Sequence, residues 1–416
     1  MVPGLSMRPM RRVVVTGIGM ASPLGCDYAA ATARLKANDH GITTMPEWDY
    51  LSHFSPRVAA KVQIPKELEI PHKAARTMGR VAQLATVATG IAIKDAGLSA
   101  RELDDGTVGL AYGSTHGSSQ ANEDWARKVA TQNGFFGVTA TTYLKFMSHT
   151  TSANLAIYFG IHGRVLSTSA ACVSASQAIG LGYEQIGCGL VDAMVCGGAE
   201  ELHYSHAAVF DMFHAASKAF NTTPELTPRP FDQRRDGLVV GEGAGTLVLE
   251  EYERAVKAGK KIYAEIIGYG TNCDGTHVTN PQAAGMRGAM ELALKSAGLR
   301  PEQIDYVNAH ATGTKIGDIA ESQGTFELFG DRVPVSSLKG HMGHTLGACG
   351  GIETAFVIAM LREGWIAPTR NLEVVGDNCA PLDYVMHQSR SAKLQRVMCN
   401  KFAFGGINTS LVLTTC

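Results

Sequence analysis

The sequence lacks paired cysteines, long apolar runs and an excess of either charge. Nine cysteines are scattered over 416 residues without a Cys-x-x-Cys pair, which argues against a disulfide framework and a structural zinc site. No stretch reaches about 18 consecutive apolar residues, so we expect no membrane-spanning helix. The 37 basic and 38 acidic residues nearly cancel, and the overall charge points to neither nucleic acid nor a membrane surface.

The beginning of the chain also lacks the features of a secretory signal. Residues 1–10 contain proline and arginine, and no apolar run precedes Val13. Together with the scattered cysteines, this composition favours a protein of the reducing cytoplasm. The sequence leaves open whether residues 1–10 belong to the native chain.

Apolar runs rich in β-branched residues alternate with helical patterns along the whole chain. The predicted strands are 12–17, 107–112, 164–169, 193–197, 246–250, 262–267, 304–308, 333–336, 397–402 and 411–414. The predicted helices are 80–96, 173–186, 280–297, 318–329 and 350–361. This alternation predicts a layered α/β fold with parallel sheets. The charged segment 251–261 separates two stretches of similar order, which suggests a duplication, and we expect segment 220–235 to be an ordered surface loop.

Cys172 lies between a predicted strand and a predicted helix. Small residues surround it in Ser167-Thr-Ser-Ala-Ala-Cys172-Val-Ser-Ala-Ser. At a helix N-terminus, unpaired N–H groups and the helix dipole favour a thiolate, and the Cys172 N–H can donate to a developing oxyanion. The local pattern alone fits a buried structural cysteine equally well.

Two histidines follow other predicted strands. His310 lies in Val307-Asn-Ala-His-Ala-Thr-Gly-Thr314, and His344 ends Lys339-Gly-His-Met-Gly-His344. Loops at the carboxyl ends of strands build sites in α/β folds, so we expect both loops to meet the Cys172 loop. Two neutral imidazoles can donate hydrogen bonds to a thioester carbonyl as negative charge builds on it, and Lys339 can position them or adjust their pKa values.

Other readings of these histidines stay open. Each imidazole could be a structural residue, and we assign His341 that role. A metal site is the next alternative, but no nearby carboxylate or cysteine completes a ligand set with His341 and His344, so we predict no metal. The C-terminal segment Lys401-Phe-Ala-Phe404-Gly-Gly fits a sharp turn with exposed N–H groups, which is either a plain turn or half of an oxyanion hole.

In this order, Cys172, the His310 loop, Lys339 with His344, and Phe404-Gly-Gly resemble the elongating β-ketoacyl-acyl-carrier-protein synthases of types I and II, in the thiolase superfamily. The resemblance extends from Val13 to beyond Asn408. Further matching segments are 197–200, 229–232, 236–237 and 241–245. It implies a thiolase-like, five-layered αβαβα sandwich of two similar halves: residues 1–255 with the nucleophilic cysteine and residues 256–416 with the His/Lys/His residues.

The resemblance implies an acyltransferase without a permanently bound cofactor. Cys172 would take an acyl group from the phosphopantetheine arm of an acyl carrier protein. Malonyl-carrier protein would then lose carbon dioxide, and its carbanion would attack the acyl-Cys172 thioester, extending a fatty acid, polyketide or aryl-polyene chain. His310, His344 and Lys339 would serve the decarboxylation. A homodimer is implied, with a heterodimer left open.

The resemblance also assigns supporting residues. The N–H groups of Cys172 and Phe404 would form the oxyanion hole, and the Phe404 ring would be a gate. Glu353 would be a structural carboxylate near Lys339. Residues implied to contact the phosphopantetheine arm are Thr312, Thr314 and Thr279. Candidates for docking the acidic carrier protein are Arg76, Arg80 and Lys218, each of which could equally be an ordinary solvated residue.

Some residues depart from the family pattern. Ala311 replaces the glycine usual after the first histidine, and His116 stands where an apolar residue often borders the acyl pocket, which makes His116 an acyl-pocket candidate. Segment 145–151 is more polar than expected at the dimer face. These departures favour a specialised synthase of polyketide or aryl-polyene type.

Three alternatives within the same fold were weighed. A biosynthetic thiolase would need a second catalytic cysteine in the C-terminal loop, where none is present. A priming synthase would carry asparagine in place of His344. A non-catalytic partner subunit, such as a chain-length factor, would normally lack Cys172.

Overall fold

The structure, a computed structural model, describes residues 10–416. The predictions for residues 1–10 therefore lie outside the described residues except at Met10. In the described part of the chain, no helix is both long enough and apolar enough to cross a lipid bilayer.

Strand pairing continues through an 11-stranded sheet in the order β12-β10-β9-β14-β15-β8-β1-β7-β6-β4-β5. A short junction divides it, because β1 and β8 pair only from Val13 to Val15. The strands on the first side are β1 (Val13–Ala21), β4 (Val108–Gly113), β5 (Val165–Thr168), β6 (Ala193–Glu200) and β7 (Gly243–Glu251). Those on the second side are β8 (Ala264–Cys273), β9 (Tyr306–Asn308), β10 (Pro334–Ser336), β12 (Asp383–Tyr384), β14 (Arg396–Phe402) and β15 (Ile407–Thr414).

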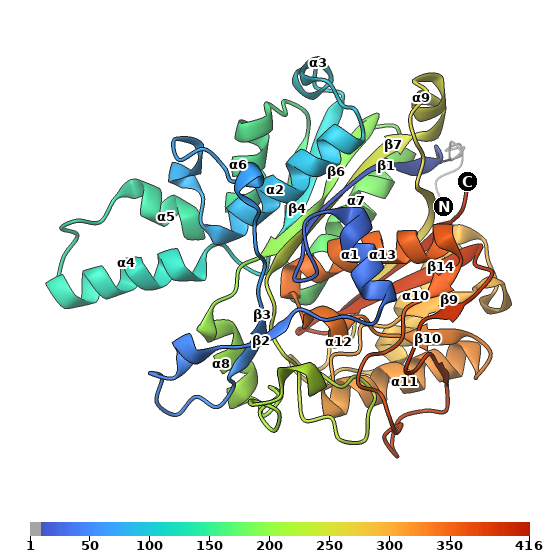
Figure 1. Cartoon of the computed structure of the whole chain (residues 1–416). Helices are drawn as coiled ribbons and strands as arrows, with labels where there is room; N and C mark the ends of the chain where they lie inside the picture. The colour runs from blue at the N-terminus through green and yellow to red at the C-terminus, as the bar shows by residue number, and fades with distance from the viewer. Residues whose placement is uncertain (1–9) are drawn as a thin grey trace.

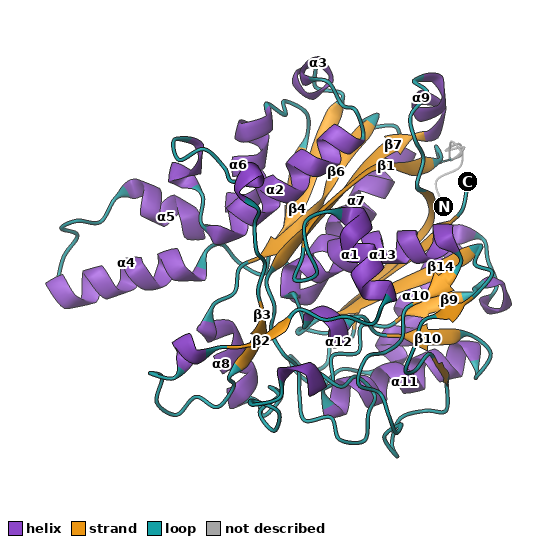
Figure 2. Cartoon of the chain, viewed as in Figure 1, coloured by secondary structure: helices purple, strands orange, loops and turns teal. Residues whose placement is uncertain are grey.

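Helices form the other three layers (Figures 1 and 2). The central layer contains α7 (Ser174–Gly187) and α13 (Cys349–Glu363), which contact strands of both halves: α7 touches β6 and β15, and α13 touches β7 and β14. The first outer layer contains α2 (Arg80–Asp95) and α6 (Thr150–Phe159). The second contains α10 (Ala283–Ala297) and α11 (Lys315–Phe329). The predicted αβαβα sandwich is therefore present.

The two halves have the same topology. The first runs β1-β7-β6-β4-β5 across its sheet, and the second runs β8-β15-β14-β9-β10. When the short edge strand β12 is set aside, these orders place the first, fifth, fourth, second and third strands of each half side by side. The predicted boundary between residues 255 and 256 falls inside α9 (Tyr252–Lys257), and it stays a prediction.

The prediction of parallel sheets is wrong in part, because each half is mixed. In the first half, β4 runs parallel to β5 and β6, but β7 runs antiparallel to β6 and β1. The second half repeats this with β15 as the antiparallel strand. Helices cover both faces of these sheets, so most strand residues are buried and the apolar pattern does not reveal the direction of a strand.

Segment 220–235 is a surface loop only in part, because residues 220–226 are partly or fully exposed whereas residues 227–232 are buried. Arg229, Phe231 and Asp232 are buried, and Arg229 Nε donates to Asp232 Oδ1 at 2.9 Å. An ion pair that is hydrogen-bonded in this way allows charged residues to be buried. The Arg and Asp residues of segment 220–235 made this segment look solvent-exposed in the sequence.

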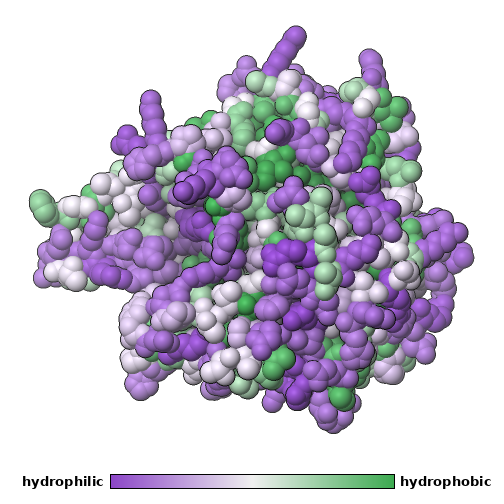
Figure 3. Space-filling view, in the orientation of Figure 1, coloured by the Kyte–Doolittle hydropathy of each residue, from purple (hydrophilic) through white to green (hydrophobic). Residues whose placement is uncertain are grey.

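The sequence analysis did not predict an arm made of α4 (Ser119–Gln132) and α5 (Ala140–Phe146), which projects from the body (Figure 1). Phe135 and Phe136 join these helices and are exposed. Hydrophobic residues are visible at the outer end of the arm (Figure 3). The remaining helices and strands are α1 (Tyr28–Lys36), α3 (Ala100–Asp104), α8 (Tyr204–Met212), α12 (Lys339–Met342), β2 (Ile42–Thr44), β3 (Val58–Ala60), β11 (Trp365–Ile366) and β13 (Arg390–Ser391).

Candidate active site

Cys172 lies in a single 3-10 turn, Ala171–Val173, between β5 and α7. The preceding Ala171 has a φ of 48°, a left-handed conformation that costs an L-residue energy and persists only where the surroundings enforce it. The thiol is buried, and the backbone N–H groups of Cys172 and Phe404 lie near enough to its sulfur to lower the pKa of the thiol slightly. The sharp turn therefore presents the sulfur to two N–H donors that come from different halves of the fold.

Two imidazoles face this sulfur. His344 Nε2 lies 3.0 Å from Cys172 Sγ, and the His310 and His344 ring centroids are 5.0 Å apart. The sulfur and one nitrogen of each ring all lie within 4.8 Å of one another. The loops after β5, β9 and β10 thus bring the three predicted residues to one point.

Carboxylates at the start of α11 hold the His310 loop in place. Glu321 accepts the backbone N–H groups of His310 and Ala311 at 2.7 and 2.6 Å, and Asp318 accepts that of Thr312 at 3.0 Å. Burial raises the pKa of Glu321 to about 8 and that of Asp318 to about 6. The sequence analysis missed both residues, although their spacing of three places them on one face of the predicted helix.

Backbone contacts fix the His344 loop. The His344 N–H donates to the Val239 carbonyl at 2.7 Å, and the next turn contains Leu346 with a φ of 45°. Buried Glu200 accepts the N–H groups of Gly347 and Thr115 at 3.1 and 3.0 Å. The turn containing Leu346 contacts the turn containing Cys172, so the thiol and imidazole rest on adjoining rigid supports.

A buried charge cluster lies behind the imidazoles. Lys339 Nζ is 2.5 Å from Glu353 Oε1, as the resemblance implied, and Lys401 Nζ is 3.0 Å from Glu353 Oε2. All three side chains are at most 1% exposed. Lys401 was not predicted as a site residue, because a single lysine in a predicted strand is usually a solvent-facing residue.

The protonation state of Cys172 differs from the thiolate that the sequence suggested. Burial raises the pKa of the Cys172 thiol to about 12, and nearby Lys339 offsets only part of this effect. Burial, with help from Lys339 and Lys401, holds the pKa values of His310 and His344 well below the ordinary range. The resting site therefore contains a protonated thiol beside two neutral imidazoles, because burial outweighs the helix N-terminus.

A cavity of about 680 Å³ reaches this constellation. Cys172, His310 and His344 line its inner part, and Phe404 lies on its wall with the ring packed on Phe210 and Phe213 at centroid distances of 5.3 and 6.0 Å. Other lining residues include Thr312, Thr314, Thr279 and Lys218. The three threonines predicted to contact a phosphopantetheine arm thus share one channel with the thiol.

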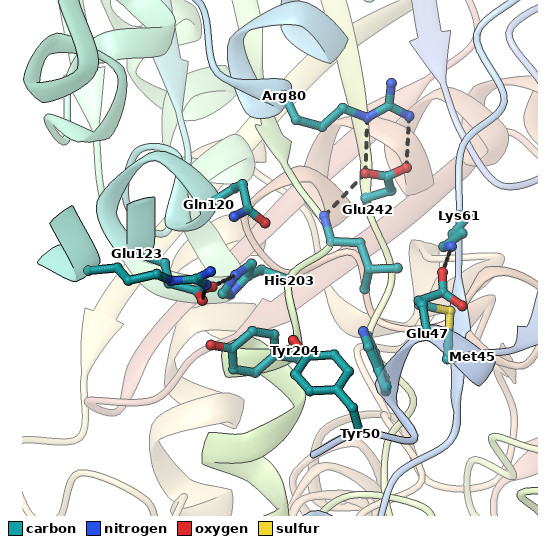
Figure 4. Close-up of a pocket in the computed structure, with 13 residues that line it drawn as sticks. Met45, Glu47, Tyr50, Lys61, Arg80, Gln120, Glu123, His203, Tyr204 and Glu242 are labelled. Atoms are coloured by element: carbon teal, nitrogen blue, oxygen red, sulfur yellow. Dashed lines mark hydrogen bonds and ion pairs between the residues drawn. The ribbon is translucent and has the colours of Figure 1, made fainter. Parts of the chain in front are cut away.

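The docking candidates occupy different settings. Arg76 is exposed, whereas Arg80 lines a second pocket of about 340 Å³ (Figure 4). There Arg80 Nη2 pairs with Glu242 Oε1 at 2.9 Å, and Lys61 pairs with Glu47. The charge of Arg80 is therefore neutralised by Glu242, and Lys218 Nζ lies 3.9 Å from Asp211 Oδ1, which leaves Arg76 as the docking candidate for which no acidic partner is described.

His116 lies on the β4 side of the fold and does not line the Cys172 cavity. Its exposed ring stacks edge-on against buried His206 at a centroid distance of 5.2 Å, and the Ser119 hydroxyl lies 2.8 Å from His206 Nε2 and 3.4 Å from His116 Nε2. His206 is one turn before Phe210 on α8, and Phe210 lines the cavity. The polar cluster of His116, Ser119 and His206 therefore lies behind Phe210, on the outer side of the wall of the Cys172 cavity.

The geometry at Cys172 favours a hydrogen bond over metal coordination. A sulfur and an imidazole nitrogen bound to one tetrahedral zinc ion lie about 3.6 Å apart. The observed 3.0 Å between His344 Nε2 and Cys172 Sγ is shorter and suits a shared proton.

Comparisons with known proteins match this arrangement. The family models described as "Beta-ketoacyl synthase, N-terminal domain" and "C-terminal domain" match residues 10–255 and 263–373. The chain is 36% identical over 404 residues to 3-oxoacyl-[acyl-carrier-protein] synthase 1 of Haemophilus influenzae, covering 97% of this chain and 98% of that protein.

Solved structures agree. A β-ketoacyl synthase from Burkholderia phymatum matches with a TM-score of 0.94 and 47% identity, over 98% of this chain and 100% of that one. The complex AntDE:AntF, a type II PKS acyl-carrier protein with its ketosynthase bound to the hexaketide, matches with a TM-score of 0.89 and 26% identity over 98% and 100% of the chains. The chain therefore belongs to the β-ketoacyl synthase family and has its thiolase-like fold.

Proposed function

We propose that this chain is an elongating 3-oxoacyl-[acyl-carrier-protein] synthase in which Cys172 carries the growing acyl group. One observation carries the proposal: a buried thiol lies 3.0 Å from His344 Nε2 and close to His310, and all three side chains line one cavity. A nucleophile, a proton acceptor and an oxyanion site are the groups that acyl transfer from a thioester requires.

Acyl transfer comes first. The Cys172 sulfur attacks the thioester carbonyl of an acyl-carrier protein, and the thiol proton passes to His344 Nε2, 3.0 Å away. The tetrahedral oxyanion accepts hydrogen bonds from the N–H groups of Cys172 and Phe404. When the intermediate collapses, the carrier thiol leaves with that proton, and the imidazole is neutral again.

Decarboxylation and condensation follow. Malonyl-carrier protein places its thioester oxygen beside His310 and His344, whose ring N–H groups stabilise the enolate that forms as carbon dioxide leaves. The enolate carbon attacks the acyl carbonyl on Cys172, the new C–C bond forms and the C–S bond breaks. The Cys172 sulfur regains a proton from solvent, and the 3-oxoacyl product stays on the carrier.

Mass spectrometry tests the proposal directly. Purified protein is incubated with a panel of acyl-carrier proteins, digested and searched for acyl adducts. We expect an adduct on Cys172 that is absent from a Cys172→Ala variant, and carbon dioxide release from malonyl-carrier protein that falls in a His310→Ala variant. An adduct on another residue, or none with any carrier, would overturn the assignment.

The acyl group is proposed to be of the polyketide or aryl-polyene type. The support is the His116, Ser119 and His206 cluster, which does not line the cavity but places hydrogen-bonding groups directly behind Phe210 on its wall. Turnover with saturated, unsaturated and aromatic acyl-carrier proteins tests this, and a preference for long saturated chains would reject it.

The physiological unit is proposed to be a homodimer of chains with halves 1–255 and 256–416. β5 is the end strand of the sheet, Val165 on it is 43% exposed, and Ile157 on the adjacent α6 is 83% exposed. An unpaired apolar edge invites pairing with another chain. Light scattering of the protein alone distinguishes this from an obligate heterodimer, which would leave this chain monomeric or aggregated.

A further inference from the structure

Lys401 is a buried cation that the proposed reaction has not yet used. It lies in β14, just before the turn that presents Phe404, and its side chain is fully buried. Its ammonium lies 2.9 Å from Asn308 Oδ1, 2.7 Å from the Asn400 carbonyl and 3.0 Å from Glu353 Oε2. Burial opposes the charged form, but the Cys399 sulfur and the Glu353 carboxylate raise the pKa of Lys401 above its ordinary value, so the amine is charged.

The cluster around Lys401 does not balance its charge. Lys339 and Lys401 each hold one oxygen of a single carboxylate, Glu353, so two cations share one anion. An unbalanced buried charge is costly in a folded protein unless an opposite charge arrives there. The anion in the proposed reaction is the malonyl group and the enolate that it becomes.

The position of Lys401 connects this charge to the imidazoles. Asn308 at the end of β9 accepts the hydrogen bond from Lys401 and lies two residues before His310. β9 pairs directly with β14, which contains Lys401. Lys339 and Lys401 both disfavour the protonated forms of His310 and His344. The other titratable groups around the imidazoles are Cys172, Cys349, Cys399, Glu200, Glu321 and Asp318.

Those other acids do not cancel the excess. Burial raises the pKa of both Glu200 and Glu321 to about 8, so at neutral pH each is mainly uncharged. Asp318 faces Arg235 at 3.8 Å. Counted with Cys399 as a thiol, whose sulfur lies 3.3 Å from Lys401 Nζ, one positive charge remains beside the imidazoles.

We propose that Lys401 is a positioning residue for decarboxylation, whose ammonium gives the Lys339–Glu353–Lys401 cluster one excess positive charge that keeps His310 and His344 neutral and stabilises the anion forming beside them. This inference rests on the proposed function. The excess charge should affect the two half-reactions differently. Acyl transfer to Cys172 requires a proton acceptor and an oxyanion hole, whereas decarboxylation requires the imidazoles to face a full negative charge.

Charge-balanced variants test the inference. Lys401→Met removes the excess charge at similar volume, and Lys401→Met combined with Glu353→Gln restores it through Lys339 alone. Lys393→Met, which makes the same substitution at an exposed residue, is the matched control. Each variant is assayed for acyl loading of Cys172, for carbon dioxide release from malonyl-carrier protein across pH 5.5 to 9, and for thermal unfolding.

In Lys401→Met we expect decarboxylation to fall about 10- to 100-fold, the effect of one unit charge between neighbouring side chains at an effective dielectric of about 20. Acyl loading should stay within about threefold, and the acid limb of the decarboxylation profile should move to higher pH because the imidazoles protonate more readily. The double variant should regain most of the lost rate and shift the limb back.

Several results would overturn the inference. Equal losses in both half-reactions would make Lys401 a structural residue, and so would a double variant slower than the single one. A variant that unfolds is separated from these cases by its melting curve and by its acyl loading. If the unaltered protein neither loads an acyl group nor releases carbon dioxide, the proposed function fails instead, and that outcome is seen before any variant is made.

Discussion

The protonation state of Cys172 gives the sharpest test of the site. With a pKa of about 12, the thiol would be ionised in only about one molecule in 10⁵ at pH 7, whereas an unperturbed cysteine with a pKa of about 8.5 is a few per cent ionised. The alkylation rate of Cys172 by iodoacetamide should therefore rise about tenfold per pH unit from pH 6 to pH 10 without levelling off.

The assay follows the Cys172 peptide by mass spectrometry after brief alkylation at each pH. Exposed Cys188 in the same digest reports the behaviour of an accessible thiol under identical conditions. A Cys172 rate that levels off below pH 8 would refute the reasoning, because it would mean that the helix N-terminus and Lys339 outweigh burial.

The same reasoning assigns a measurable role to His344. Because the thiol is protonated at rest, its proton must leave as the sulfur attacks, and His344 Nε2 is positioned to receive it. We expect His344→Ala to slow acyl loading at pH 7 by about 10²- to 10⁴-fold, the usual contribution of a positioned general base. The deficit should narrow as the pH rises and hydroxide takes over the deprotonation, whereas a purely structural role would leave it constant.

Three further predictions concern stability and substrate binding. Burial raises the pKa of Glu200 from 4.5 to about 8, so the stability that this carboxyl contributes is present below pH 4.5 and is lost as the pH rises toward 8. In urea titrations at pH 5 and pH 8.5, the unaltered protein should therefore lose about 2 to 4 kcal/mol more unfolding free energy than the Glu200→Gln variant loses. Phe356→Ala empties a fully buried position in the central helix α13 and should cost about 3 to 5 kcal/mol in the same titrations. Thr312→Val and Thr314→Val should each raise the KM for carrier-bound thioesters about fivefold with little change in kcat, as expected for the loss of one hydrogen bond to the arm.

The meeting of Cys172, His310 and His344 could be predicted from the sequence because each follows a recognisable strand. In a layered α/β fold, residues immediately after strands lie at one edge of a sheet, and this narrows the possible positions of a side chain considerably. Small residues around Cys172 and glycines around His344 marked the turns where backbones approach closely. The fold class followed from the same alternation of strands and helices.

The missing features share a physical cause. Lys401 occurs in a strand buried on both faces, where period-two patterning does not tell which face a polar residue occupies. Glu321 and Asp318 look like ordinary acids on a helix until the His310 loop is seen to donate to them. The α4–α5 arm buries little of its surface against the rest of the fold, so its sequence has no apolar stripe that would predict how the arm packs.

The topology explains why the excess charge lies on one side of the site. Cys172 follows β5 and His344 follows β10, and these strands occupy the same place in the two halves. A symmetrical frame therefore brings two equivalent turns together, but it supplies a nucleophile from the first half and an imidazole from the second. Lys339, Glu353 and Lys401 all belong to the second half, behind the imidazoles. The positive charge is thus placed on the side where the proposed reaction generates an enolate, while the thiol contacts a neutral base and is influenced by that charge only through Lys339. As proposed, substitution of Lys401 should therefore affect decarboxylation more strongly than acyl transfer.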